Sequence, residues 1–189
     1  MAPHVAGLQL RGIDARAVDL PKGRAERAVP IFARLLASEP GIAVGGHSFG
    51  GRVASFAVAD ACDAGRPPVA LVLLSYPLHA PGRPDDWDAR TAHWPRITCP
   101  VIVLSGTSDP FATPALMARA LAERLPGAEL VTYPRLGHTL APVLDDVLDR
   151  VAAFVLAAAA SDQPRDQEVG EAVRYQDTTT LGRRPRSVE

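Results

Sequence analysis

Lysine, aromatic side chains and net charge are all scarce in this chain of 189 residues. Lys22 is the only lysine, and 20 basic side chains are balanced by 21 acidic ones, which gives a formal net charge of -1. Nucleic acids and anionic membranes attract proteins that carry a clustered or overall positive charge. The near-neutral balance therefore argues against both of these partners.

Cysteine is equally rare, and Cys62 and Cys99 fit none of the known metal or redox spacings. Isolated thiols are usually small hydrophobic residues of the core, and free thiols are typical of a reducing cytoplasm. The sequence contains no metal-ligand cluster, phosphate-binding loop or cofactor fingerprint. We therefore predict that neither a metal nor a cofactor is needed.

Long hydrophobic runs are missing as well. The longest, residues 151–160, is mostly alanine and too short to span a bilayer. Residues 1–10 lack the basic segment and long apolar stretch of a signal peptide. A cytoplasmic protein without a membrane segment is expected, and its oligomeric state stays open.

What the chain does contain is an alternation of strand-like and helix-like segments, with 47% hydrophobic residues overall. This alternation predicts an α/β fold: a three-layer sandwich around a mostly parallel sheet of about five strands. The strands are expected at residues 13–20, 42–45, 69–75, 100–105 and 128–133, and the helices at residues 25–38, 51–61, 114–125 and 142–160.

Domain organisation follows from length and from a change in composition. A chain of this length fits one domain, which we place at residues 1–160. Residues 161–189 are polar and charged and are expected to form a disordered tail.

Residues 46–50 read Gly-His-Ser-Phe-Gly, a G-x-S-x-G motif between a short predicted strand and a predicted helix. This context is that of a nucleophile elbow, in which the serine lies on a strained turn and the glycines allow strand and helix to approach closely. Ser48 is the candidate nucleophile. The alternative is a glycine-rich turn that contains a serine by chance.

A serine hydroxyl needs a base to remove its proton and a third group to orient that base. Asp109 follows the predicted strand at residues 100–105, and His138 follows the last one. Both therefore lie at carboxyl ends of strands, where ligand sites of open α/β sheets form. Taken singly, Asp109 could instead form an Asp-Pro turn and His138 could be a polar loop residue.

Several segments resemble a known family, namely residues 45–52, Tyr-Pro-Leu-His at 76–79, and Gly-Thr-Ser-Asp-Pro-Phe at 106–111. They are similar to the dienelactone-hydrolase-like branch of the α/β hydrolases. Within it they are most similar to the group of the NSL-complex third subunit and testis-expressed protein thirty. The resemblance covers residues 8–157 and implies a small hydrolase without a lid, with a triad of Ser48, Asp109 and His138.

The front of the chain departs from this family, which has a further strand and a glycine-rich loop upstream. That loop supplies one backbone N–H of the oxyanion hole, so only the N–H of Phe49 is assignable here. Loss of one such donor typically costs about 2.7 to 4 kcal/mol. We expect either that the strand at residues 13–20 pairs directly with the nucleophile strand, or that the chain is N-terminally truncated; truncation is favoured.

The loop at residues 76–98 reaches the carboxyl side of the predicted sheet. Tyr76, His79 and Trp94 are therefore candidates for lining a substrate pocket, the alternative being that they cover the sheet edge. For His47, beside the nucleophile, a structural role is favoured. These observations predict a serine hydrolase that cleaves a small carboxylic ester, lactone or thioester through an acyl-enzyme on Ser48. The alternative is a non-catalytic or truncated hydrolase-like interaction scaffold.

Overall fold

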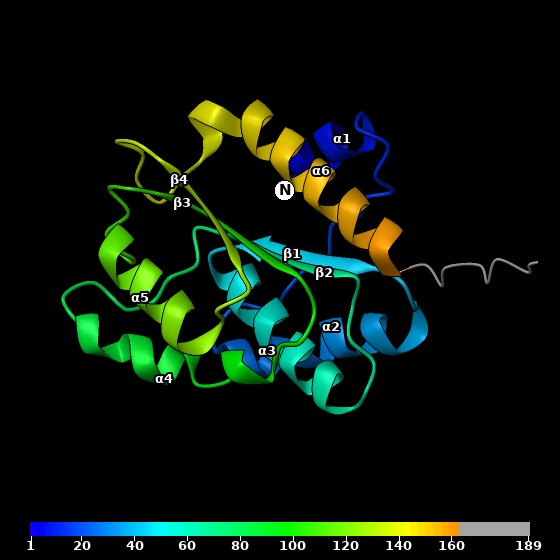
Figure 1. Cartoon of the computed structure of the whole chain (residues 1–189), viewed down its shortest axis with the longest axis horizontal. Helices are drawn as coiled ribbons and strands as arrows, with labels where there is room; N and C mark the ends of the chain where they lie inside the picture. The colour runs from blue at the N-terminus through cyan, green and yellow to red at the C-terminus, as the bar shows by residue number, and fades with distance from the viewer. Residues whose placement is uncertain (163–189) are drawn as a thin grey trace, which may run out of the picture.

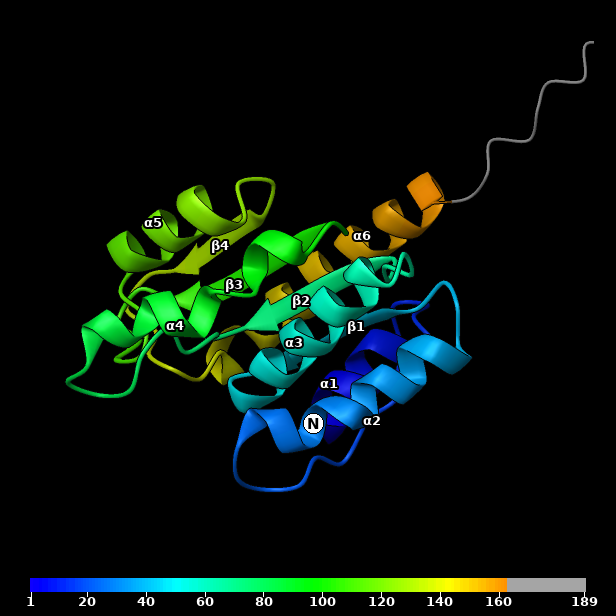
Figure 2. The ribbon, with the colours of Figure 1, turned by 90° about the horizontal axis from the view of Figure 1, so that it is seen from below.

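The computed structural model describes residues 1–162, which form a parallel sheet covered by helices on both faces (Figures 1 and 2). In chain order its elements are α1 (Ala2–Gln9), α2 (Ala25–Ser38), β1 (Ala43–His47), α3 (Phe49–Asp63), β2 (Ala70–Leu74), α4 (Trp87–Thr91), β3 (Val101–Gly106), α5 (Pro114–Arg124), β4 (Glu129–Tyr133) and α6 (Leu144–Asp162), with 3-10 turns at Pro84–Asp86, Trp94–Arg96 and Ala141–Val143.

The sheet has the strand order β1-β2-β3-β4, and every neighbouring pair is parallel. Every residue of β2 and β3 is buried, as expected for continuous apolar strands that are covered on both faces. The predicted α/β sandwich with a parallel sheet is thereby confirmed.

Alternate residues of the central strands feed two separate cores. Leu71, Leu73 and Val103 pack against α2, α3 and α5 on one face. Val72 and Leu104 pack against α6 on the other face, where α1 also lies (Figure 1). This division follows from the two-residue period of a strand, which points successive side chains to opposite faces.

The segment at residues 13–20 does not form the predicted fifth strand. It is part of no sheet, and its backbone is bonded locally: the N–H of Ile13 donates to the carbonyl of Leu8, and the carbonyl of Ala15 accepts from the side chain of Gln9. The direct pairing with β1 that was one of the two expectations is therefore not formed. Alternating apolar residues were insufficient to predict a strand, since a strand also needs a partner along its edge.

Helix α1 was not predicted, although Pro3 is a residue favoured in the first turn of a helix. Its apolar residues do not gather on one face, so the segment lacks the apolar periodicity on which helix prediction rests. None of its residues is buried. It contacts α6, and just beyond it Arg11 forms ion pairs with Asp145 and Asp149.

The two cysteines are both free, Cys99 being buried and Cys62 half-buried. Burial raises the pKa of the Cys99 thiol to about 12.

None of the helices in residues 1–162 is long and apolar enough to cross a membrane. The first two residues of the predicted tail, Ser161 and Asp162, are the last residues of α6. The rest of the predicted tail, residues 163–189, lies outside the described residues.

The central position of β2 predicts the cost of truncating one of its side chains. Leu73 is completely buried, so Leu73→Ala should lower the free energy of unfolding by about 2 to 5 kcal/mol through lost contacts and the cavity that remains. Leu156→Ala is the control, since Leu156 on α6 is 50% exposed and its truncation should change stability by less than about 0.5 kcal/mol. Urea unfolding measures both values. Equal values for the two variants would contradict the burial of β2.

Candidate active site

Ser48 lies on a sharp turn between β1 and α3. Its φ of 52° and ψ of -113° are backbone angles that a residue with a side chain rarely adopts. The turn brings β1 very close to α3: a Cβ atom on Gly46 would lie 2.6 Å from the carbonyl carbon of Gly50. Gly46, the first glycine of the motif, is therefore needed for this approach, as a nucleophile elbow requires.

Asp109 lies on the turn after β3, and its side chain is completely shielded from solvent. One carboxylate oxygen, Oδ1, accepts a hydrogen bond from the backbone N–H of Phe111 at 2.9 Å. The N–H of Ser108 donates to the carbonyl of Leu136 at 2.8 Å, which joins this turn to the loop that follows β4. These bonds fix the carboxylate next to the loop that carries His138.

His138 joins the other two side chains. Its Nδ1 lies 2.9 Å from Asp109 Oδ2, and its Nε2 lies 2.7 Å from Ser48 Oγ. The carboxylate accepts only, so Nδ1 donates to it and Nε2 is left to accept from the serine hydroxyl. The structure thus brings together the three residues that the sequence singled out, in the arrangement of a Ser-His-Asp triad.

The backbone N–H of Phe49, the first residue of α3, has no acceptor among residues 1–162. It directly follows Ser48, and the first N–H groups of a helix have no partner within the helix. It therefore matches the oxyanion donor expected from the sequence. We assign no second donor within the described residues.

Comparisons with known proteins identify the family of this domain. Residues 22–156 match the family described as alpha/beta hydrolase domain. The chain belongs to this family. No curated protein matches it significantly. The finer resemblance to the dienelactone-hydrolase-like branch finds no further support in these comparisons.

Solved structures of hydrolases share the fold at low sequence identity. The monoacylglycerol lipase of Paleococcus ferrophilus has a TM-score of 0.70 at 13% identity, with 82% of this chain and 88% of the lipase covered. A puromycin-hydrolysing peptidase of Mycobacterium tuberculosis has a TM-score of 0.51 at 21% identity, covering 71% of this chain and 25% of the peptidase. E-2-(acetamidomethylene)succinate hydrolase has a TM-score of 0.53 at 14% identity, with 72% of this chain and 76% of that hydrolase covered.

Two further residues of this hydrolase domain contact the triad histidine. His47 Nε2 donates to the backbone carbonyl of His138 at 2.9 Å, which agrees with the structural role favoured for His47. The ring of Phe111 lies 4.5 Å from the ring of His138, centre to centre. The sequence did not single out Phe111 as a site residue, and its place in the Asp-Pro-Phe turn beside Asp109 was the available signal.

Tyr76, His79 and Trp94, the candidates for a substrate pocket, are all buried. The side chains of Tyr76 and Trp94 pack edge to face in the core, and the Tyr76 hydroxyl donates to the carbonyl of Arg90 at 2.8 Å. His79 Nδ1 donates to the carbonyl of Ala80 at 2.8 Å. The structure thus corrects the expectation for Tyr76 and Trp94: with no exposed surface, they support the loop from within instead of facing a substrate.

The loop at residues 76–98 also carries His93, which forms a buried polar pair with Ser55 of α3. His93 Nε2 lies 2.8 Å from Ser55 Oγ, and this hydroxyl donates its only hydrogen to the carbonyl of Arg52. His93 therefore donates to Ser55 from Nε2. Burial, followed by the positive charges of Arg96 and Arg52, lowers the pKa of His93 to about 3. The imidazole is neutral at physiological pH.

The close approach at the elbow makes Gly46 intolerant of a side chain. Gly46→Ala would place a Cβ against the backbone of Gly50, which cannot yield without moving α3. We expect a loss of stability of more than about 2 kcal/mol or insoluble protein. Gly50→Ala is the matched control, because a Cβ there meets only Leu20 Cδ1 at an ordinary 3.9 Å. Thermal unfolding of both variants measures the difference, and equal melting temperatures would argue against this packing.

The neutral state of His93 predicts a pH dependence of stability. Its pKa is about 3 in the folded chain and about 6.5 when unfolded, so only the unfolded state gains a proton between these values. The contribution of neutral His93 to the free energy of unfolding is complete above about pH 6.5. It is lost as the pH falls toward 3, by up to about 1.4 kcal/mol per pH unit. His93→Gln should show a correspondingly shallower decline in urea unfolding from pH 6.5 to 4. Identical pH slopes for the wild type and His93→Gln would mean that the His93 ring is not held neutral in the folded chain.

Proposed function

We propose that this α/β hydrolase domain is a serine hydrolase that cleaves a small carboxylic ester, lactone or thioester. The observation that carries the proposal is the hydrogen-bonded chain from Ser48 Oγ through His138 to Asp109. These side chains follow three different strands of one parallel sheet. Contacts of this length are what proton transfer from a serine nucleophile requires.

The mechanism follows from the donors and acceptors of this chain. His138 Nε2 takes the proton from Ser48 Oγ as the oxygen attacks the carbonyl carbon of the substrate. Asp109 stabilises the imidazolium that forms and holds it in place through Nδ1. The backbone N–H of Phe49 donates to the developing oxyanion. His138 then returns its proton to the leaving alkoxide or thiolate, and water hydrolyses the acyl-enzyme by the reverse proton transfers.

The substrate class is proposed from the access to the triad and from the family resemblance. The His138 side chain is 25% exposed whereas the Asp109 side chain is fully shielded, so a substrate approaches from the histidine side. The resemblance to dienelactone-hydrolase-like proteins favours a small acyl group.

A cytoplasmic location is part of the proposal, because two free thiols suit a reducing compartment.

A non-catalytic scaffold is the second candidate. It is favoured by the single assigned oxyanion donor, Phe49, because the loss of one donor weakens catalysis by about 10² to 10³-fold. A scaffold has no use for a buried carboxylate aligned with a histidine and a serine, so we rank it second. The labelling experiment below separates the two candidates.

Replacement of the nucleophile tests the proposal directly. Ser48→Ala should abolish labelling by a fluorophosphonate probe and lower the hydrolysis of short p-nitrophenyl esters by at least about 10³-fold. Ser38→Ala is the matched control, because Ser38 is an exposed serine at the end of α2. Asp109→Asn should lower turnover by about 10⁴-fold, since the amide disfavours the required tautomer. Equal labelling of the wild type and Ser48→Ala, or none of either, would sink the proposal.

A further inference from the structure

The ring of His138 has to satisfy two hydrogen bonds at once, to Asp109 on one side and to Ser48 on the other. The last torsion of a histidine side chain has a broad energy profile, so the torsion itself does not hold the plane of the ring. The side chain is also 25% exposed, so it is not enclosed by a core. Contacts with neighbouring residues must therefore keep the imidazole in the plane that both bonds require.

Phe111 makes one such contact. Its ring lies 4.5 Å from the ring of His138, centre to centre, with an angle of 57° between the two planes. Phe111 is half-buried, and within residues 1–162 it belongs to neither of the two apolar cores that cover the sheet. Phenylalanine rings usually contribute to a protein through core packing. Core packing does not account for this ring, whereas its contact with His138 does.

The backbone of Phe111 is held in turn by the acid of the triad. Its N–H donates to Asp109 Oδ1 at 2.9 Å, and its carbonyl accepts from the N–H of His79 at 3.2 Å. Pro110, between Asp109 and Phe111, has a fixed φ and stiffens this turn. Asp109, Phe111 and His138 therefore form a contact triangle, closed by the bond from His138 Nδ1 to Asp109 Oδ2. Three contacts fix three groups relative to one another, whereas two would leave a hinge.

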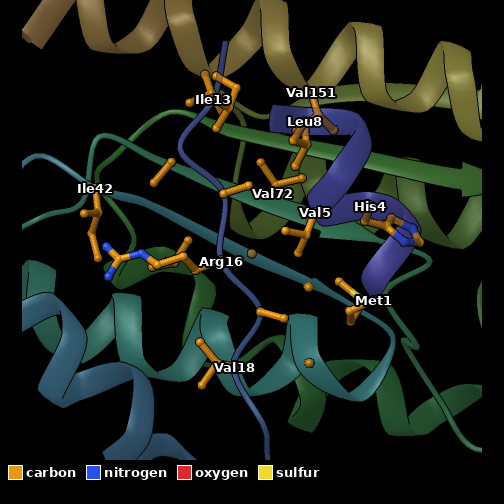
Figure 3. Close-up of a pocket in the computed structure, with 18 of the residues that line it drawn as sticks. Met1, His4, Val5, Leu8, Ile13, Arg16, Val18, Ile42, Val72 and Val151 are labelled. Atoms are coloured by element: carbon orange, nitrogen blue, oxygen red, sulfur yellow. The ribbon is translucent and has the colours of Figure 1, made fainter. Parts of the chain in front are cut away.

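His47 holds the backbone of the same histidine. Its Nε2 donates to the carbonyl of His138 at 2.9 Å, and the two rings lie 5.1 Å apart. Because His47 directly precedes Ser48, this bond joins the backbone of the base to the strand of the nucleophile. His47 is half-buried and borders the cavity of about 810 Å³ on the outer side of β1 that Figure 3 shows. Close packing therefore does not fix its side chain, and the bond to His138 does.

We propose that Phe111 and His47 are positioning residues of the triad. Phe111 holds the plane of the His138 ring, and His47 holds the backbone of His138 at the distance that Ser48 requires. The proposal rests on the proposed function, in which His138 is the base. Neither side chain takes part in the proton transfers of that mechanism. Replacing either one should slow the reaction of Ser48 while leaving every reacting group in place.

The rate at which a fluorophosphonate probe labels Ser48 measures the role of Phe111. Phe111→Ala opens the contact triangle but keeps the backbone N–H that bonds Asp109. Labelling should slow by about 2- to 12-fold, which is what one aromatic contact contributes to an equilibrium. Phe111→Tyr keeps the ring and should label at the wild-type rate. Equal rates for Phe111→Ala and the wild type overturn the role of Phe111.

Phe56→Ala is the matched control, because it also removes a half-buried ring that lies against a histidine. The ring of Phe56 is 3.9 Å from that of His93, which is outside the triad, and it packs against the core on the α3 side of the sheet. Phe56→Ala should therefore lower the melting temperature more than Phe111→Ala does, yet leave the labelling rate unchanged. If labelling slows in proportion to lost stability in both variants, Phe111 is merely structural and the proposal fails.

Two substitutions of His47 test the bond to the backbone of His138. His47→Gln and His47→Leu both remove the ring, but only glutamine keeps an N–H donor at a similar reach. His47→Leu should slow the labelling of Ser48 by about 2- to 12-fold, the net contribution of one hydrogen bond. His47→Gln should keep most of the wild-type rate. Equal rates for the two variants overturn the role of His47.

NMR of the ring proton on His138 Nδ1 separates a failure of this proposal from a failure of the proposed function. A ring N–H that is held in a hydrogen bond exchanges slowly with water, so its downfield signal is visible. The signal, identified by its loss in His138→Gln, should persist in Phe111→Tyr and broaden or vanish in Phe111→Ala. The measurement needs no reaction at Ser48, so it tests the positioning by itself. An equally sharp signal in Phe111→Ala, or no signal in the wild type, overturns the proposal.

Discussion

The parallel pairing of β1 to β4 is the constraint on which the rest of the molecule depends. Parallel strands end at the same edge of a sheet, so whatever follows their last residues is brought together there. Ser48 follows β1, Asp109 follows β3, and His138 follows β4. Residues separated by up to 90 positions meet at hydrogen-bond distance for this reason. Without the parallel pairing, the three side chains would have no common location.

Alignment of strand ends is coarse, and close backbone contacts refine it. The approach of Gly46 to Gly50 sets the strained angles of Ser48, which aim its hydroxyl at His138. A second close contact lies at the end of β3, where a Cβ on Gly106 would be 2.2 Å from the carbonyl oxygen of Leu136. The turn that carries Asp109 and the loop that carries His138 are therefore in direct backbone contact. Two backbone contacts that only glycine allows thus position the nucleophile and its base.

The sheet has two edge strands, β1 and β4. β2 and β3 are paired on both sides, while β1 and β4 each have a neighbour on one side only. A cavity of about 810 Å³ borders the outer edge of β1, and Phe49 and Gly50 at the start of α3 line it as well. The strand that carries the nucleophile is therefore also an edge strand of the sheet.

The sequence by itself determined the α/β alternation, the parallel sheet, the elbow at Ser48, and Asp109 and His138 at strand ends. Each of these rests on local patterns: apolar runs, glycine spacing and chain order. Only the tertiary structure decided that residues 13–20 stay unpaired, that Tyr76 and Trp94 are core residues, and that β1 borders a cavity. The physical reason is that strand pairing and burial depend on partners distant in the chain, which no local pattern specifies.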